Sequence, residues 1–152
     1  MVLEFLSDFQ DEALLVARIF VGALFLIHGL PKLVGAGRKG MREGMGQMGI
    51  PGPLFDLVGL LEFLGGLALV FGFLTRLVSL LFVLQMIGTT LLYVTKLNKA
   101  PIPRGAMEEA FRRTKGYISG WELDTVLLSA CLLFAVLGPG DWALDALVSL
   151  GL

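Results

Sequence analysis

Four apolar stretches, separated by polar segments, dominate the pattern along this chain. A helix rises about 1.5 Å per residue, so about 20 apolar residues are needed to cross a hydrocarbon core about 30 Å thick. Three of the stretches reach that length and the last is shorter. They cover residues 13–34, 54–74, 77–97 and 121–137. The pattern predicts an all-α fold, a four-helix transmembrane bundle that forms a single domain over residues 1–152.

The connections between these spans differ in length. Only Thr75 and Arg76 separate the second span from the third, so these two helices are expected to be antiparallel neighbours joined by a tight turn. The other connections, residues 35–53 and 98–120, are longer and are punctuated by glycine and proline, which is typical of loops. We expect both to lie at a membrane surface.

Composition agrees with this interpretation. Hydrophobic residues make up 56% of the 152-residue chain and charged residues 16%, whereas a water-soluble domain averages about 25% charged residues. A chain so poor in charge cannot cover a soluble surface, so membrane lipid is an expected partner. The sequence shows no basic groove with interleaved aromatic residues, and nucleic acid is not an expected partner.

The basic residues are distributed unevenly between the two ends of the spans. Ten of the 12 flank the two long connections, and only Arg18 and Arg76 fall at the opposite ends. Because positive charge marks the cytoplasmic side, the long loops are predicted to be cytoplasmic and both termini to face outward. Asp141 and Asp145, which come after "GPG", are expected to pair with Arg76 at the outer surface.

Several polar side chains fall inside the apolar stretches. Counted at about 1.5 Å per residue from the outer edge, Arg18 lies at about 8 Å, Gln85 at about 14 Å, Glu62 at about 18 Å and His28 at about 22 Å. Lys32 falls at the inner edge, where its long side chain can reach water. A charge at the middle of a span costs about 2.5–3.5 kcal/mol on insertion scales, which makes Glu62 a candidate functional residue.

A helical wheel places these polar groups on faces that also carry glycine. One face of the first span holds Arg18, Gly22, Phe25, Gly29 and Lys32, with His28 about 80° to its side, and one face of the second holds Phe55, Gly59, Glu62, Gly66, Leu69 and Phe73. Small residues allow membrane helices to approach closely. Both faces are therefore expected to point into the bundle.

Each polar residue has a structural interpretation beside a functional one. Glu62 belongs to a site, or it forms a fixed salt bridge with Arg18 that joins the first two helices. Arg18 also lies near enough to the edge to reach water. His28 is a proton carrier, a ligand donor or a hydrogen-bonded packing residue, and Gln85 bonds neighbouring helices. With one histidine and one cysteine in the sequence, no metal site is expected.

Three phrases together resemble one protein family. They are "RIFVGALFLIHGLPKL" in the first span, "GLLEFLGGLALVFGFLTRL" across the second span and its turn, and "GWELDTVLLSACLLFAVLGPGDWALD" near the end, and they look like the DoxX family of small four-helix membrane proteins. The resemblance runs from Leu15 to Asp145. It implies a multi-pass protein of the prokaryotic plasma membrane in a redox-linked setting, because the family includes components associated with thiosulfate:quinone oxidoreductase.

The resemblance implies a subunit of a quinone-dependent oxidoreductase, acting with partner subunits. The sequence carries no haem-attachment, nucleotide-binding or iron–sulfur motif, so the expected electron carrier is a diffusible quinone held between helices. Glu62, His28 and Arg18 are the predicted catalytic residues, able to hydrogen-bond the carbonyls or move protons. The residues predicted to bind the ligand are Arg18, Phe25, His28, Lys32, Phe55, Glu62 and Gln85.

Two other classes of protein remain open. The same pocket suits a non-catalytic protein that binds lipid or a small molecule, or a transporter, which would recognise a polar ligand through Glu62 and Arg18. The chain also suits an assembly subunit whose glycine faces bind a larger complex or a second copy of itself. A quinone enzyme requires bound quinone, a transporter requires flux, and an assembly subunit requires a stable partner.

Overall fold

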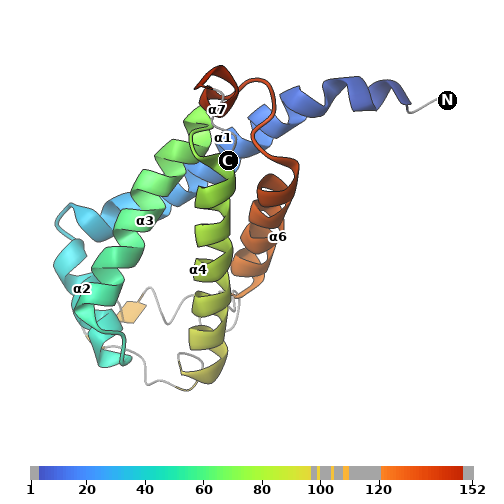
Figure 1. Ribbon diagram of the computed structural model, residues 1–152. Helices are drawn as coiled ribbons and strands as arrows, with labels where there is room; N and C mark the ends of the chain where they lie inside the picture. Colours follow the sequence, from blue (N-terminus) through green and yellow to red (C-terminus); the bar gives the residue numbers. More distant parts are fainter. Residues whose placement is uncertain (1–3, 97–98, 100–103, 105–107, 110–120, 149–152) are drawn as a thin grey trace.

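The long helices of the protein are arranged as two packed pairs (Figure 1). The computed structural model describes residues 4–96, 99, 104, 108–109 and 121–148. Helix α1 packs on α3 and α4 packs on α6, with fewer contacts between the pairs. No strand occurs among the described residues, so the predicted all-α fold is confirmed. The elements are η1 (Glu4–Phe9), α1 (Gln10–Leu33), α2 (Arg38–Gln47), α3 (Gly52–Phe71), α4 (Thr75–Thr95), α6 (Trp121–Leu137) and α7 (Leu144–Val148).

Three of these helices, α1, α3 and α4, are long and apolar enough to cross a membrane, and α6 is a further helix of 17 residues. The helices lie where the sequence predicted spans, and α6 has the predicted bounds. Helix α3 ends earlier than expected because Gly72 adopts a left-handed conformation with φ of 67° and stops it. The apolar pattern continues past Gly72, so hydropathy alone could not locate this end.

The connection after α1 contains helix α2, whereas the glycines and prolines of this segment predicted a loop. Three glycines lie in α2, so its intrinsic helix propensity is low. Packing and ion pairs compensate for this low helix propensity. Met48, at its end, is buried, and Arg38 and Arg42 bond to Asp56 at the start of α3. The second long connection, residues 98–120, lies almost entirely outside the described residues.

Helices α1 and α3 touch backbone to backbone through glycines. A Cβ atom at Gly22 would lie 2.7 Å from the carbonyl oxygen of Gly66, and one at Gly29 would lie 2.6 Å from the backbone nitrogen of Phe63. Larger residues at these positions would push the helices apart. The predicted inward faces are confirmed, with one exception. Phe73 is 43% exposed, because α3 ends before it.

Buried Arg18 ties α1 to the end of the bundle near α7. Its side chain is 0% exposed, and its guanidinium donates to the carbonyl oxygens of Leu69 (3.2 Å) and Trp142 (2.6 Å). Asp145 of α7 supplies the opposing charge. Its distance from the end of the span had allowed Arg18 to reach water. It does not, because the segment that leads into α7 folds over it.

Asp145 caps α4 and does not pair with Arg76. Its two carboxylate oxygens accept hydrogen bonds from the backbone N–H groups of Leu74 (2.7 Å) and Thr75 (2.8 Å). Within the described chain, no side chain adjacent to α4 caps this N-terminus, so a carboxylate distant in sequence satisfies it. Arg76 instead donates to backbone carbonyls at the end of α6. The predicted pairing of Arg76 with Asp145 is wrong, and the backbone N–H of Asp141 donates to an α1 carboxylate.

We expect Gly66→Ala to destabilise the protein, because a methyl group there would collide with the backbone of α1. Overpacking of this kind costs about 1–3 kcal/mol, and thermal unfolding in detergent, followed by circular dichroism, measures the loss. Gly88→Ala on α4 is the matched control, since a Cβ there meets no atom within 4 Å. The control should be neutral or slightly stabilising, because alanine favours helix. Equal stability of the two variants would contradict the close contact.

Asp145→Ala should lower stability by about 1–3 kcal/mol, because two N–H groups lose their acceptor and Arg18 loses its counter-charge. The same unfolding assay tests this. The double charge swap Arg76→Asp, Asp145→Arg should not restore stability. Recovery in the swapped protein would instead support a direct pair between these two residues.

Candidate functional site

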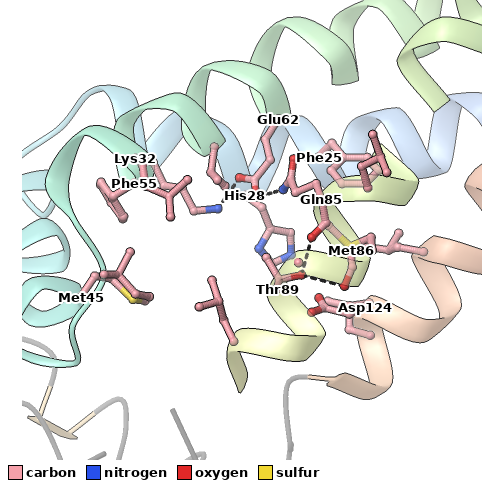
Figure 2. Close-up of a pocket in the computed structure, with 18 residues that line it drawn as sticks. Phe25, His28, Lys32, Met45, Phe55, Glu62, Gln85, Met86, Thr89 and Asp124 are labelled. Carbon is pink, nitrogen blue, oxygen red and sulfur yellow. Dashed lines mark hydrogen bonds and ion pairs between the residues drawn. The ribbon is translucent and has the colours of Figure 1, made fainter. Parts of the chain in front are cut away.

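An apolar cavity of about 590 Å³ lies between the two helix pairs, on the side toward α2 (Figure 2). Figure 1 shows α3 and α4 close together at their shared turn and farther apart toward α2. The volume falls within the range of about 300–1,000 Å³ usual for small-molecule sites. The cavity is lined by Phe25, His28, Lys32, Met45, Ile50, Leu54, Phe55, Val58, Glu62, Leu84, Gln85, Met86, Gly88, Thr89, Leu92, Leu123, Asp124 and Leu127.

Glu62 places a buried carboxylate in the wall of this cavity. The residue is 6% exposed, forms an ion pair with the Nζ atom of Lys32 and accepts a hydrogen bond of 2.9 Å from Nε2 of Gln85. The salt bridge between Glu62 and Arg18 that the sequence left open is not formed, because Arg18 is held at the other end of the bundle. One carboxylate thus joins α1, α3 and α4.

Lys32 reaches Glu62 because Gly59 leaves room for its stem. A Cβ atom at Gly59 would lie 2.7 Å from the Cβ of Lys32. Helical side chains lean toward the N-terminus of their helix, so Lys32 turns back from the end of α1 into the bundle. The expectation that Lys32 extends to water is therefore wrong. Its side chain is only 21% exposed and its charge is paired.

The Glu62 carboxylate fixes the orientation of the Gln85 amide. An ionised carboxylate only accepts hydrogen bonds, so Gln85 must present its Nε2 group to it. The Oε1 atom of Gln85 is then buried, with no donor among the described residues. An unpaired buried acceptor costs about 1–3 kcal/mol. Gln85 does bond a neighbouring helix, as expected, but its own Oε1 atom is left without a hydrogen bond.

Besides Glu62 and its partners, a second set of polar side chains lines the cavity. Figure 2 shows the ring of His28 between Glu62 and the side chains of Thr89 and Asp124. Thr89 lies on α4 and Asp124 on α6, and both line the cavity together with His28 and Lys32 of α1. All four long helices therefore contribute polar groups to the cavity.

Asp124 is the acidic residue of the cavity that was not among the predicted site residues. The buried positions of α6 are Leu127, Cys131 and Phe134. Asp124 precedes them by three, seven and ten residues, which puts it on the same helical stripe. This spacing was the available signal, and hydropathy hid it because Asp124 falls at the boundary of the span.

Six of the seven predicted ligand-binding residues line the cavity, and Arg18 does not. Phe25 stacks on Phe82 of α4, with ring centroids 3.6 Å apart, and so joins the two helix pairs beside the cavity. Phe55 lies on the α3 side. Of the three predicted catalytic residues, the structure brings Glu62 and His28 into one cavity and leaves Arg18 outside it.

The arrangement suits an organic ligand with a polar group and an apolar body. Lys32 can donate to a ligand oxygen, and Glu62, His28 and Asp124 are groups that exchange protons. Phe25 and the surrounding aliphatic residues can pack against a ring. Within the described part of the chain, no three His, Cys, Asp or Glu residues are grouped so as to hold a metal ion.

These features define a small helical membrane protein with polar groups inside an apolar cavity. The family model described as DoxX matches residues 13–95. The chain belongs to the DoxX family, as the sequence phrases predicted.

Similar proteins support this assignment over nearly the whole chain. The chain is 35% identical over 144 residues to "Inner membrane protein YqjF" of Escherichia coli (strain K12), covering 95% of this chain and 98% of that protein. It is 30% identical over 137 residues to "Putative oxidoreductase CatD" of Bacillus subtilis (strain 168), covering 90% and 87%. It is also 30% identical over 137 residues to "Inner membrane protein YphA" of Escherichia coli (strain K12), covering 87% of each chain. No solved structure matches the chain.

Lys32 and Glu62 should show strong energetic coupling in a double-mutant cycle. Lys32→Met or Glu62→Gln alone leaves one charge without its partner in an apolar wall, whereas the double variant removes both charges. We expect a coupling energy of about 1–3 kcal/mol, measured by unfolding in detergent. The exposed pair Lys39 and Glu43, with nitrogen and oxygen 3.9 Å apart, is the control, and about 0.3–0.5 kcal/mol is expected there. Equal coupling in both cycles would show that the cavity pair is effectively solvated.

Proposed function

We propose that this chain is the membrane component of a quinone-linked oxidoreductase and that the cavity binds the quinone. The observation that carries the proposal is the ion pair of Lys32 and Glu62, bound to Gln85 and set in a cavity lined mainly by apolar residues. A quinone matches this combination, because it has a flat apolar ring with carbonyl oxygens and enters from the lipid. One carbonyl would accept a hydrogen bond from Lys32.

Reduction of a quinone to a quinol consumes two electrons and two protons. In the proposed mechanism the electrons come from a redox partner protein, and groups of this chain supply the protons to the two ring oxygens. Glu62 and His28 both line the cavity, and each would pass on a proton taken up from water, since the ionised Glu62 carboxylate carries no proton of its own. Lys32 positions the ring and stabilises negative charge that develops on the oxygen during reduction. Arg18, outside the cavity, has a structural role here.

The comparisons supply supporting context for the proposal. One relative carries the name "Putative oxidoreductase CatD", and two are named inner membrane proteins. We accordingly place the chain in the prokaryotic plasma membrane as a multi-pass protein. The distribution of basic residues puts α2 and the cavity end of the bundle on the cytoplasmic side, with both termini outside.

A non-catalytic site for a lipid-soluble molecule is the second candidate function. It is favoured by the same ion pair, because a carboxylate already paired with lysine can anchor a ligand without exchanging protons. The two candidates differ in turnover. A binding or transport protein keeps its ligand chemically unchanged, whereas a quinone enzyme converts bound quinone into quinol when an electron donor is supplied.

Quinone that co-purifies with the protein in mild detergent should be quantified by mass spectrometry of the organic extract. We expect quinone in the native protein and at least a tenfold loss in Glu62→Gln, which corresponds to about 1.4 kcal/mol of binding free energy. Glu122→Gln is the matched control, because Glu122 lies on α6, is exposed and does not line the cavity.

The outcomes separate the candidates. Quinone retained in the control and lost in Glu62→Gln supports the proposal, provided that circular dichroism shows both variants folded. A different lipid-soluble compound with the same pattern would favour the non-catalytic function. Equal quinone content in all three proteins, or none in any of them, would remove the support for a quinone site at Glu62.

A further inference from the structure

A second hollow, of about 650 Å³, lies on the charged side of α2. Side chains of α2 line it, together with Gly52 and Asp56 at the start of α3. It does not share its lining residues with the apolar cavity. The mechanism proposed above leaves these charged groups without a role.

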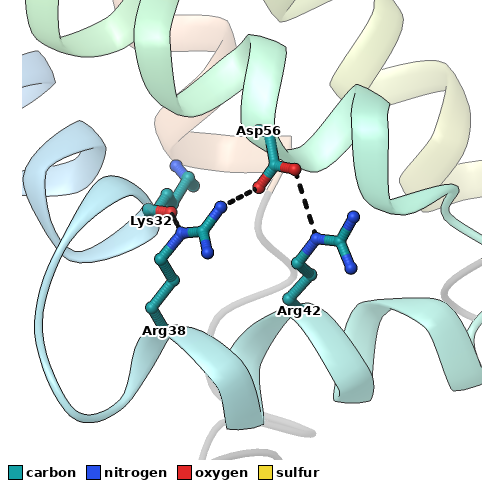
Figure 3. Close-up of polar contacts among 4 residues, drawn as sticks. All are labelled: Lys32, Arg38, Arg42 and Asp56. Carbon is teal, nitrogen blue, oxygen red and sulfur yellow. Dashed lines mark hydrogen bonds and ion pairs between the residues drawn. The ribbon is translucent and has the colours of Figure 1, made fainter.

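Asp56 holds two arginines of α2 in fixed positions (Figure 3). Its Oδ1 atom accepts from Nη2 of Arg38 at 2.7 Å and its Oδ2 atom accepts from Nε of Arg42 at 3.2 Å. Arg38 also donates from Nε to the backbone carbonyl of Lys32 at 2.9 Å. One carboxylate and the backbone carbonyl of Lys32 thus orient the guanidinium groups of two side chains that are 38% and 42% exposed.

The guanidinium of Arg42 keeps donors available for a ligand. Figure 3 shows its two terminal nitrogens directed away from Asp56, and the described part of the chain provides no acceptor for them. The group lies directly over Gly52, where a Cβ atom would overlap it. A planar guanidinium whose two terminal nitrogens still have N–H groups to donate matches the geometry of phosphate oxygens.

The position and charge of α2 indicate where such a phosphate comes from. The helix directly follows α1, a membrane span, and its hollow contains three basic side chains against two acidic ones, Glu43 and Asp56. The opposite side of α2 faces the protein, since Met45 lines the apolar cavity and Met48 is buried. A helix placed in this way presents its cations at headgroup depth, where anionic lipid attracts Lys and Arg.

We propose that Arg38 and Arg42, oriented by Asp56, bind the phosphate of an anionic phospholipid headgroup in the leaflet next to α2. The binding is specific, because it depends on the geometry that Asp56 imposes and not only on positive charge. It is independent of the quinone proposal, since the two hollows use different residues.

Lipid binding should be measured by native mass spectrometry of the delipidated protein in detergent, titrated with phosphatidylglycerol or with phosphatidylcholine of the same chain length. We expect phosphatidylglycerol to bind more tightly, and Arg42→Gln to weaken its binding about fivefold or more. Lys96→Gln is the matched control, because it removes one exposed cation on the same side of the bundle but outside the hollow. The control should bind lipid like the unchanged protein.

Asp56→Asn provides the decisive comparison. It removes a negative charge, so attraction by charge alone would strengthen binding of the anionic lipid. If Asp56 orients the arginines, binding should instead weaken, because the amide accepts fewer hydrogen bonds from them. Tighter or unchanged binding in folded Asp56→Asn, or an equal loss in Lys96→Gln, would overturn the proposal. Inorganic phosphate that displaces the lipid at equal concentration would overturn the lipid assignment and indicate a soluble anion.

Discussion

The close approach of α1 and α3 is the constraint on which the rest of this bundle depends. Gly22 and Gly66 bring the two backbones into contact, and that contact sets the distances over which the polar side chains must act. In lipid the hydrophobic effect does not hold helices together, so close packing and hydrogen bonds do. At this spacing Lys32 reaches Glu62 at one end of the pair, and Arg18 reaches the backbone of Leu69 at the other.

The two ends of the bundle use their buried charges differently. Near α7, Arg18 and Asp145 bind backbone groups of three segments and pin the turn between α3 and α4. Toward α2, the charges of Lys32 and Glu62 bind each other inside an open cavity. Because α3 and α4 are fixed together at the turn and separate away from it, the cavity lies toward the second end.

Periodicity along single helices was enough to predict much of this arrangement. The glycine faces and six cavity residues follow from the 3.6-residue repeat and from depth along a span. The repeat does not show which groups the charged side chains bind, because those contacts depend on how far and in which direction side chains extend between helices. Glu62 therefore binds Lys32 in place of Arg18, and Asp145 caps α4 in place of binding Arg76. Helix α2 was missed because its contacts with α3 outweigh its glycine content.

Stability explains the charges at one end of the bundle and does not explain those at the other. Arg18 and Asp145 satisfy backbone carbonyls and N–H groups that would otherwise be unpaired in an apolar setting. The pair of Lys32 and Glu62 satisfies mainly itself, and an apolar pair of similar volume is often as stable as a buried ion pair or more stable. Buried atoms without a partner among the described residues occur at both ends, Oε1 of Gln85 at this one and Nε of Arg18 at the other, so they do not distinguish the two. These side chains join three helices, but an apolar pair could do the same, and the ligand proposed for the cavity would account for the choice of charged groups there.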